Sequence, residues 1–496
     1  MNKSTLRRLA KIEDRIKQIV HEELGLDTFP IEFDIVPTQK MFEILAYNIP
    51  TNISNWKRGR DYERTRTIYE KADPNLPYEV VINSNPARAY FMNSNTFAVQ
   101  VLVMAHVYGH CAFFTNNKYF RKSRQDIIEI MHAASERVNK YERKYGIDEV
   151  ESTVDAGHAL QLHSSPFASE ETENEKRRRI FEQEKAKIYA GERTAYSDLL
   201  GGPKVKVDED VELYNQKLWK LLRLTTPVEP TDDILRYIID NSRILEDWQN
   251  DILEILRIEG QYYWPMMKTK YMNEGFATLV HEKVMTKLFR EGKLTAGEHA
   301  QFNYSNSLVK AENPFQLNPY LMGCSMWKNI EERWNTGRHG REWADCIDVK
   351  QKEEWDTDDM EGWEKCKSVM TTYTDWFFVQ NFLTPDLIRD MKIYLYKPQV
   401  KSKSIDYIVT KAEAEEIREK IVAAFAASPV PKIKIVNGNY DDKGWMALEH
   451  RWAGSDLDIT YANETLKHIV RLWGQPARLT TKEGDEDKVI TVQDDD

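Results

Sequence analysis

The sequence predicts an α+β protein with a mainly helical body and a small C-terminal α+β domain. Two observations support this class. Apolar residues recur every three or four positions through most of residues 1–388, which is the spacing of one face of an α-helix. After residue 388 the pattern changes to short alternating runs separated by turn residues, which is typical of β-strands. We therefore expect two domains, 1–388 and 389–496.

The body begins with an amphipathic helix over residues 5–25, in which one face carries Leu6, Leu9, Ile12, Ile16 and Ile19. Alternating segments then predict two strands, at 31–36 and 78–83. The remaining periodic segments predict helices over 93–112, 124–143, 148–162, 231–261, 273–291 and 318–337. In the helix over 93–112, one face is expected to carry Val99, Val103, His106, His110 and Phe113.

Three segments of the body interrupt this helical pattern. Residues 164–193 are highly charged and predict either a solvated helix or a mobile insertion. Residues 199–212 contain two adjacent glycines and a proline, and we expect a loop there. Pro265 is expected to break the helical pattern because proline lacks the backbone N–H that a helix interior requires.

The C-terminal domain is expected to be a compact α+β module without a catalytic cluster of its own. Its strands are predicted at 391–399, 405–410, 431–440, 445–452, 476–483 and 488–493. Two helices are predicted between them, at 411–427 and 459–474. The chemistry of the protein is therefore expected in the body, and this domain is expected to be accessory.

The composition excludes several classes of function and indicates a cytoplasmic protein. A net charge of -11 argues against a general binder of nucleic acid or of anionic membranes. The four cysteines form no C-x-x-C pair and are too sparse for a disulfide framework. The charged N-terminus has no apolar segment of the kind found in signal peptides. We find no run of about 20 apolar residues free of charges, so no membrane span is expected.

Two histidines inside an apolar segment form the first part of a candidate metal site. His106 and His110 lie four residues apart in "VLVMAHVYGHCAFFTNN", so on a helix both imidazoles project from the same face. This is the spacing of the zinc-protease motif H-E-x-x-H, but Val107 stands where that motif has its glutamate. The alternative is a pair of core histidines that are satisfied by hydrogen bonds.

A second segment supplies a candidate third ligand. In "YMNEGFATLVHEKVM", Asn273, Glu274 and Ala277 match N-E-x-x-A, the pattern on the glutamate-bearing helix of gluzincin metallopeptidases. His106, His110 and Glu274 would together hold a divalent metal, with zinc expected and iron or manganese as alternatives. The body is then expected to be zincin-like. The alternative is that Glu274 only places a negative charge at the start of its helix.

A hydrolase would need a general base other than Val107. Glu259, in the aromatic segment "RIEGQYYWP", is our first candidate, with Asp155 and Glu151 as alternatives. His281 lies about 10 Å along the helix from Glu274, at 1.5 Å per residue, and is expected to line the pocket. There it would polarise a substrate carbonyl or bind a second metal. Glu282 points to another helix face and is expected to be solvated.

A third polar group occurs in "VDAGHALQLHSSP". Asp155 and His158 are three residues apart, and Glu151 lies one helical turn before Asp155. These residues would form either the second shell of the first metal site or a second site. The alternative is a polar helix face that carries a capping histidine.

Three long segments resemble the stage V sporulation protein R (SpoVR) family. They are "MAHVYGHCAFFTNN", "LEDWQNDILEILRIEGQYYWPMMKTKYMNEGFATLVHEKVM" and "NPYLMGCSMWKNIEERW". The resemblance covers most of residues 5–390, and the later part looks like the C-terminal region of that family. It implies a link to spore cortex formation in spore-formers and to stress or stationary-phase physiology elsewhere. It also implies a serine protein kinase and a von Willebrand-type protein as partners.

Two functions remain open at the level of the sequence. The first is a gluzincin-like, metal-dependent hydrolase that cleaves a peptide or a peptidoglycan-type amide. The second is a non-catalytic, metal-stabilised scaffold that acts with the serine protein kinase. Val107 favours the scaffold, whereas the spare carboxylates and His281 favour the hydrolase.

Overall fold

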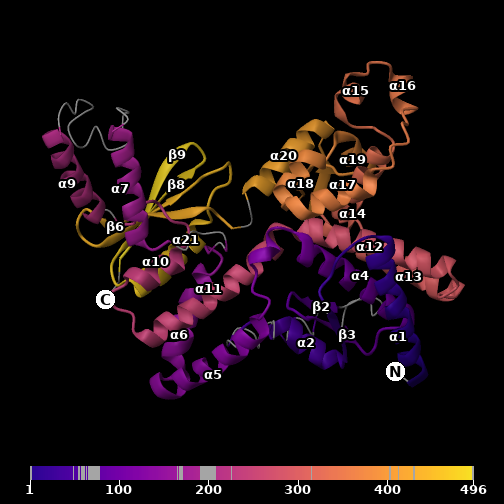
Figure 1. The fold of residues 1–496 in the computed structure, drawn as a ribbon, viewed down its shortest axis with the longest axis horizontal. Coiled ribbons are helices and arrows are strands. Elements are labelled where there is room, and N and C mark those ends of the chain that lie inside the picture. Colours follow the sequence, from indigo (N-terminus) through magenta and orange to yellow (C-terminus); the bar gives the residue numbers. More distant parts are fainter. Residues whose placement is uncertain are drawn as a thin grey trace. The chain divides into compact units, whose positions relative to one another are not determined.

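The structure of this chain is a computed structural model, shown in Figure 1. It describes residues 3–47, 50–53, 79–164, 171–189, 208–224, 226–313, 316–401, 404–410, 413–427 and 430–493, and the single residues 56, 62, 64, 67 and 166. The chain groups into two compact units. The first contains residues 1–137 and 262–426, and the second contains residues 138–261 and 427–496. The predicted division at residue 388 stays a prediction.

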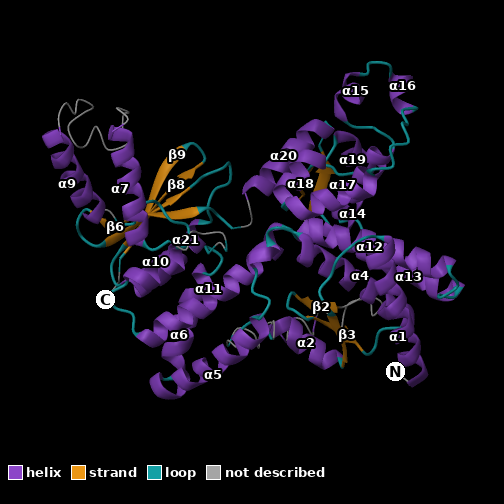
Figure 2. Ribbon diagram, in the orientation of Figure 1, coloured by secondary structure: helices purple, strands orange, loops and turns teal. Residues whose placement is uncertain are grey.

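The first unit is mainly helical and contains two small sheets (Figure 2). Its α-helices are α1 (Lys3–Gln18), α2 (Thr38–Tyr47), α4 (Phe97–Asn116), α5 (Ile127–Tyr145, which continues into the second unit), α12 (Lys270–Arg290), α13 (Ala296–Val309), α14 (Pro319–Asn335), α15 (Gly340–Asp345), α16 (Val349–Glu353), α17 (Gly362–Thr372), α18 (Asp375–Phe382), α19 (Pro385–Asp390) and α20 (Ala414–Ala427). A π-helix, η1 (Ile19–Glu23), extends α1, and a 3-10 helix, η2 (Phe120–Lys122), follows α4.

The predicted strands of the body form a sheet that brings Glu79 to the helical core. The strands are β1 (Ile31–Val36), β2 (Glu79–Ile82) and β3 (Ala87–Met92), in the order β1-β3-β2. β1 is parallel to β3, and β2 is antiparallel to it, with Glu79 opposite the buried Phe91. The strands predicted at 31–36 and 78–83 are thus confirmed. A separate hairpin contains β4 (Tyr396–Lys401) and β5 (Ser404–Val409).

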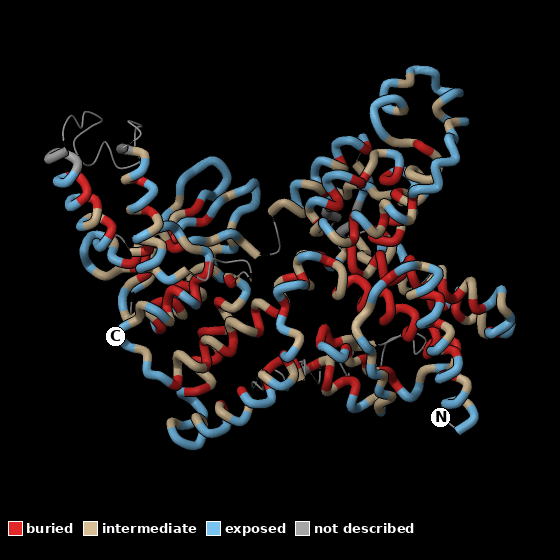
Figure 3. The backbone as a smooth tube through the Cα atoms, viewed as in Figure 1, coloured by how far each residue is buried: buried red, intermediate tan, exposed pale blue. Residues whose placement is uncertain are grey.

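Helix α4 is the central helix of the first unit, and every residue from Ala98 to Phe114 is buried (Figure 3). The prediction that a single face of this helix packs against the protein is therefore incomplete, because all of its faces are buried. α4 is also long and apolar enough to cross a membrane by length and composition, so our expectation that no such run exists is wrong for residues 97–116. However, 94% of its most apolar window is buried inside the protein. α4 is the core helix of this unit.

Glycines allow α4, α12 and α14 to pack with their backbones in contact (Figure 1). A Cβ atom added at Gly109 would lie 2.6 Å from the Cα of Ala277. A Cβ atom added at Gly275 would lie 2.3 Å from the carbonyl carbon of Gly323. Both distances are shorter than any van der Waals contact allows. The close crossing brings the residues beside Gly109 and Gly275 together, and these residues include His110 and Glu274.

The first turn of α12 is held by a carboxylate from α18. Asp375 accepts hydrogen bonds from the backbone N–H groups of Tyr271, at 2.9 Å, and Met272, at 2.8 Å. A side-chain acceptor at a helix N-terminus satisfies donors that have no partner within the helix. Only 6% of Asp375 is exposed, so water does not readily replace it. Asp375 therefore fixes the start of the helix that carries Glu274.

Asp375→Ala is expected to lower the free energy of unfolding by about 2–3 kcal/mol, because two buried N–H groups lose their acceptor. Asp458 makes the same contacts at the start of α21 (Ile459–Trp473), but it is exposed. Asp458→Ala is therefore the matched control, with an expected cost of about 1 kcal/mol. Urea unfolding of both variants measures the difference. Equal costs for the two substitutions would contradict the role of burial.

The second unit contains a four-stranded sheet covered by helices. Its strands are β6 (Ile433–Tyr440), β7 (Trp445–His450), β8 (Ala477–Glu483) and β9 (Glu486–Val492), in sequential order, with only β7 and β8 parallel. Its helices are α6 (Ile147–Leu160), α7 (Glu173–Tyr189), α9 (Asp208–Leu224), α10 (Ile234–Asn241), α11 (Asp247–Lys268, which continues into the first unit) and α21. The four strands and the one helix predicted after residue 430 are confirmed. A mainly helical protein with a small C-terminal sheet domain is therefore confirmed as well.

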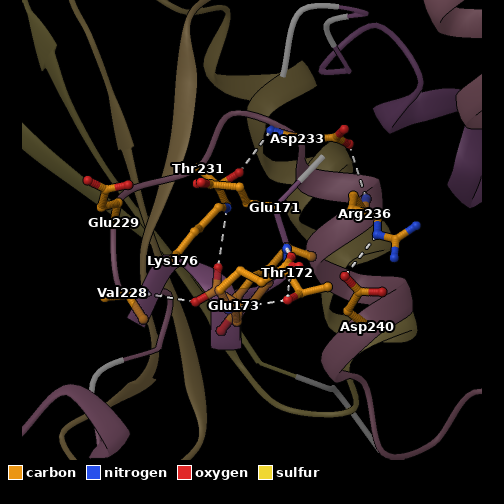
Figure 4. Close-up of polar contacts among 12 residues, drawn as sticks. Glu171, Thr172, Glu173, Lys176, Val228, Glu229, Thr231, Asp233, Arg236 and Asp240 are labelled. Atoms are coloured by element: carbon orange, nitrogen blue, oxygen red, sulfur yellow. Dashed lines mark hydrogen bonds and ion pairs between the residues drawn. The ribbon is translucent and has the colours of Figure 1, made fainter. Parts of the chain in front are cut away.

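The charged segment 164–193 contains a helix that is held by polar contacts (Figure 4). Glu173 at the start of α7 accepts a hydrogen bond from the backbone N–H of Val228, at 3.0 Å. Lys176 lies 3.4 Å from the same carboxylate. Ile180 packs in an apolar cluster with residues of α9. Of the two alternatives for this segment, the helix is thus found over residues 173–189.

Three local predictions are wrong. The single helix predicted at 231–261 is divided into α10 and α11, with a break over residues 242–246. The loop predicted at 199–212 ends earlier, because α9 begins at Asp208; residues 199–207 lie outside the described residues. Pro265 lies inside α11, which continues to Lys268. The break comes at Thr269, whose backbone leaves the helical region with φ at -133°. The hydroxyl of Thr269 donates to the carbonyl of Pro265 at 2.7 Å, which stabilises this end of the helix.

Candidate metal centre

The two histidines of α4 direct their Nε2 atoms toward the same carboxylate, that of Glu274. One helical turn separates His106 and His110, and their ring centroids are 4.5 Å apart. Both are buried, with 3% and 5% exposed. Within the described chain, the Nε2 of His106 has no hydrogen-bond partner. A core histidine that serves only packing would have both ring nitrogens satisfied.

Glu274 faces both histidines at distances that suit a shared ion. Its Oε2 atom lies 3.5 Å from the Nε2 of His106 and 3.4 Å from the Nε2 of His110. These distances are too long for good hydrogen bonds. They match the separation of about 3.4 Å between ligands that each lie about 2.1 Å from a tetrahedral zinc ion. Oε2 is also buried without a hydrogen-bond partner in the described part of the chain.

Glu79 supplies a second carboxylate that sequence reasoning missed. Its Oε1 atom lies 3.7 Å from the Nε2 of His106. Ligand atoms of Glu79, His106 and His110 all lie within 4.8 Å of one another. Glu79 begins β2, and no helical spacing relates it to the histidines. Only the pairing of β2 with β3 brings it to α4, so no motif in the sequence marked it.

The site combines buried acids with buried imidazoles. Burial raises the pKa of Glu79 to about 7, and the charge of Glu274 also raises it. Burial lowers the pKa of His110 to about 4, which keeps its imidazole neutral. Burial would raise the pKa of Glu274, but the neighbouring His110 and His106 bring it below its ordinary value. Burial would lower the pKa of His106, but Glu274 and Glu79 bring it above its ordinary value. A divalent cation would require both imidazoles in their neutral form, beside ionised carboxylates.

The Nδ1 atom of His110 is held by Asn273. The two atoms Nδ1 and Oδ1 are 2.9 Å apart. Because the amide oxygen only accepts, Nδ1 must donate, and the lone pair of Nε2 then points toward Glu274. Asn273 is the first residue of the N-E-x-x-A pattern, and Ala277, its last, packs against Gly109. Each residue of the pattern therefore has a structural role in this site.

His281 contacts His106, and both of its ring nitrogens have protein partners. Its Nδ1 lies 2.9 Å from the Nδ1 of His106, and its Nε2 lies 3.0 Å from the Oδ1 of Asn306. Burial lowers the pKa of His281 to about 3. The predicted catalytic role of His281 stays a prediction. The geometry instead places it behind His106, on the side away from Glu274.

The other predicted residues belong to the second unit. Glu259 on α11 is fully buried, and its Oε2 lies 3.8 Å from the Nε2 of His158 on α6. Asp155 and Glu151 lie on the same helix as His158. The structure thus brings together Glu259 and His158, which the sequence left in separate groups. Glu259 as the general base, and the other three as a second shell or second site, stay predictions.

Val107 is fully buried in the apolar core. The residue after His106 therefore contributes packing, and the nearest additional carboxylate comes from Glu79 on β2.

Comparisons with known proteins show which family the chain belongs to. Residues 3–429 match the family described as SpoVR like protein, and residues 431–484 match the SpoVR-like C-terminal domain. A relative from Escherichia coli (strain K12), the uncharacterized protein YcgB, is 29% identical over 487 residues. That match covers 94% of this chain and 89% of the relative. No solved structure matches the chain. The match over nearly its whole length shows that the chain belongs to the SpoVR family.

Proposed function

We propose that this protein is a metal-dependent hydrolase whose zinc ion is held by His106, His110 and Glu274. One observation carries the proposal. The two Nε2 atoms lie 3.4 and 3.5 Å from the same carboxylate oxygen, which is the spacing of ligands around a tetrahedral ion. The unpartnered atoms of His106 and Glu274 fit such an ion, because buried polar atoms without partners are costly.

Glu79 is our candidate for the general base that Val107 cannot supply. An ion at this site would act as a Lewis acid toward a carbonyl group. A carboxylate whose pKa is raised to about 7 can take a proton from the attacking water near neutral pH. The side chains of Glu79 and Glu274 are 15% and 21% exposed, compared with 4% for His106. Substrate would therefore approach from the carboxylate side of the site.

Tyr320 on α14 completes this side of the site. Its hydroxyl donates a hydrogen bond to the carboxylate of Glu274, and its ring centroid lies 6.0 Å from that of His106. Burial raises the pKa of Tyr320 well above its ordinary value, so the hydroxyl keeps its proton. It can therefore hold the carboxylate group of Glu274 in place.

The proposed substrate is a peptide or a peptidoglycan-type amide. Support comes from the family's link to the spore cortex and from the gluzincin-like pattern. His106 and His110 lie on one helix and Glu274 on a second, and the two helices cross at Gly109 and Ala277. These two crossing helices, one with two histidines and one with a glutamate, also support our proposal that the body is zincin-like.

Metal stoichiometry tests the proposal directly. The purified protein is expected to bind about one equivalent of zinc, measured by elemental analysis and titration calorimetry. The double variant His106→Ala, His110→Ala is expected to bind none at this site. His132→Ala is the matched control, because the side chain of His132 is 81% exposed on α5. A wild-type protein that binds no zinc, iron or manganese would contradict the proposal.

The second candidate is a metal-stabilised scaffold that acts with a serine protein kinase. The buried Val107 favours it, because the usual base is missing at that position. Glu79→Gln separates the two functions. A hydrolase is expected to keep its metal in this variant and lose most of its turnover of amide substrates. A wild-type protein that holds zinc but cleaves neither peptides nor peptidoglycan amides would support the scaffold.

A further inference from the structure

We propose that Glu282 sets the tautomer of His106 through a hydrogen-bond chain, so that the Nε2 of His106 is free to bind a metal ion. The chain contains Glu282, Asn306, His281 and His106, and we call it the Glu282 chain. This inference rests on the proposed function, since it concerns the same ion. It assigns positioning roles to residues that no motif marked.

The outer end of the Glu282 chain is a firmly ionised carboxylate. Lys310 lies 2.5 Å from Oε1 of Glu282, and Lys328 lies 2.5 Å from Oε2. The side chain of Glu282 is only 16% exposed, so the expectation of a solvated charge is wrong. Burial would raise its pKa, but the two lysines and Asn306 hold it at about 2. A carboxylate in this state only accepts hydrogen bonds.

The ionised Glu282 determines which way the amide of Asn306 points. The Nδ2 of Asn306 donates to Oε1 of Glu282 at 2.8 Å. The amide oxygen of Asn306 must then face the other way, and it lies 3.0 Å from the Nε2 of His281. Because this oxygen only accepts, the proton of neutral His281 sits on Nε2.

The tautomer of His281 in turn determines which ring nitrogen of His106 donates to it. With its proton on Nε2, His281 offers a lone pair at Nδ1, 2.9 Å from the Nδ1 of His106. His106 must therefore donate from Nδ1, and in its neutral form it keeps a lone pair on Nε2. That Nε2 faces Glu274 and Glu79 at 3.5 and 3.7 Å. Metal-binding histidines commonly donate their other N–H to an outer partner, which fixes the ring and its tautomer.

Without Glu282, either histidine can carry the shared proton. If Asn306 turned its amide around, His281 would carry its proton on Nδ1 and donate to His106. The Nε2 of His106 would then carry a proton and could not bind a metal ion. Removal of outer partners of metal-bound histidines typically weakens metal binding about 10- to 100-fold. We expect an effect of this size here.

Glu282→Gln is the decisive variant, because a glutamine can donate as well as accept. Glu274 and Glu79 raise the pKa of His106 against the effect of burial, so the measurement is made above that pKa, where the imidazole is neutral. There, nitrogen-15 NMR of histidine-labelled full-length protein without metal reports the tautomer of His106 directly. The wild type is expected to show its proton on Nδ1, whereas Glu282→Gln is expected to populate the other tautomer. Zinc titration is expected to show an affinity about 10- to 100-fold lower for this variant.

Glu331→Gln is the matched control. Glu331 forms a 2.5 Å ion pair with Lys283, which also joins α12 to α14. No hydrogen bond links this pair to His281 in the described structure, so neither the tautomer nor the affinity is expected to change. If Glu282→Gln fails to fold, Asn306→Ala breaks the same chain and is expected to have the same effects.

The NMR and metal-binding results distinguish an error in the Glu282 chain from an error in the proposed function. If Glu282→Gln or Asn306→Ala keeps the wild-type tautomer of His106, or if Glu331→Gln changes it as much, the Glu282 chain is overturned. A wild-type protein with the expected tautomer that binds no metal would instead overturn the proposed function, because the NMR measurement needs no ion.

Discussion

Gly275→Ala is expected to lower the free energy of unfolding by about 3 kcal/mol and to abolish metal binding. The new methyl group would lie 2.3 Å from the carbonyl carbon of Gly323, which is backbone and cannot rotate away. Helices α12 and α14 must therefore separate. Glu274 is the neighbouring residue, so its carboxylate would move away from His106 and His110. Sites of this kind require ligand positions within about 0.5 Å.

Urea unfolding and zinc titration measure the two effects of Gly275→Ala. Gly297→Ala, at an exposed position of α13, is the matched control because no atom lies within 4 Å of the position of its new Cβ. That variant is expected to be more stable by about 0.5–1 kcal/mol, since alanine favours the helix more than glycine does. A Gly275→Ala protein with wild-type stability and affinity would contradict the close crossing of the two helices.

Removal of the proposed ion is expected to produce an equally large loss of stability. An ion that binds only the folded state stabilises it by about 4 kcal/mol when its free concentration is a thousand times the Kd. The metal-free site also leaves Glu79 and Glu274 as buried acids near each other, and their mutual repulsion contributes to the raised pKa of Glu79. Chelation should therefore lower the thermal midpoint of the wild type.

A double variant, Glu79→Gln with Glu274→Gln, tests the origin of that loss. It removes both carboxylates and keeps the side-chain volumes nearly unchanged. We expect it to be more stable than the metal-free wild type and to be insensitive to chelator. Calorimetric scans with and without chelator check this. A wild type whose midpoint does not change on chelation, after zinc saturation has been verified, would contradict the expected stabilisation.

Much of the local structure could be predicted because it depends on short-range patterns. The spacing of Leu9, Ile12 and Ile16 predicted α1, and alternation predicted the strands from Ile31 and Glu79. Predictions failed where tertiary packing overrides a local preference. Pro265 is tolerated inside α11, and the break occurs at Thr269. α4 is apolar on all sides because other elements of the first unit cover it, which a single-face pattern cannot show.

In the candidate site, too, some residues follow from short-range patterns and others depend on tertiary packing. A helix fixes the relation between residues four apart, so the sequence alone already placed His106 and His110 on one face. The match to N-E-x-x-A was enough to select Glu274. Glu79 and His281 come from elements distant from α4 along the chain, and no spacing rule connects them to it. Strand pairing and the glycine contacts between helices bring each of these two side chains within 4 Å of His106, and only the tertiary structure determines such contacts.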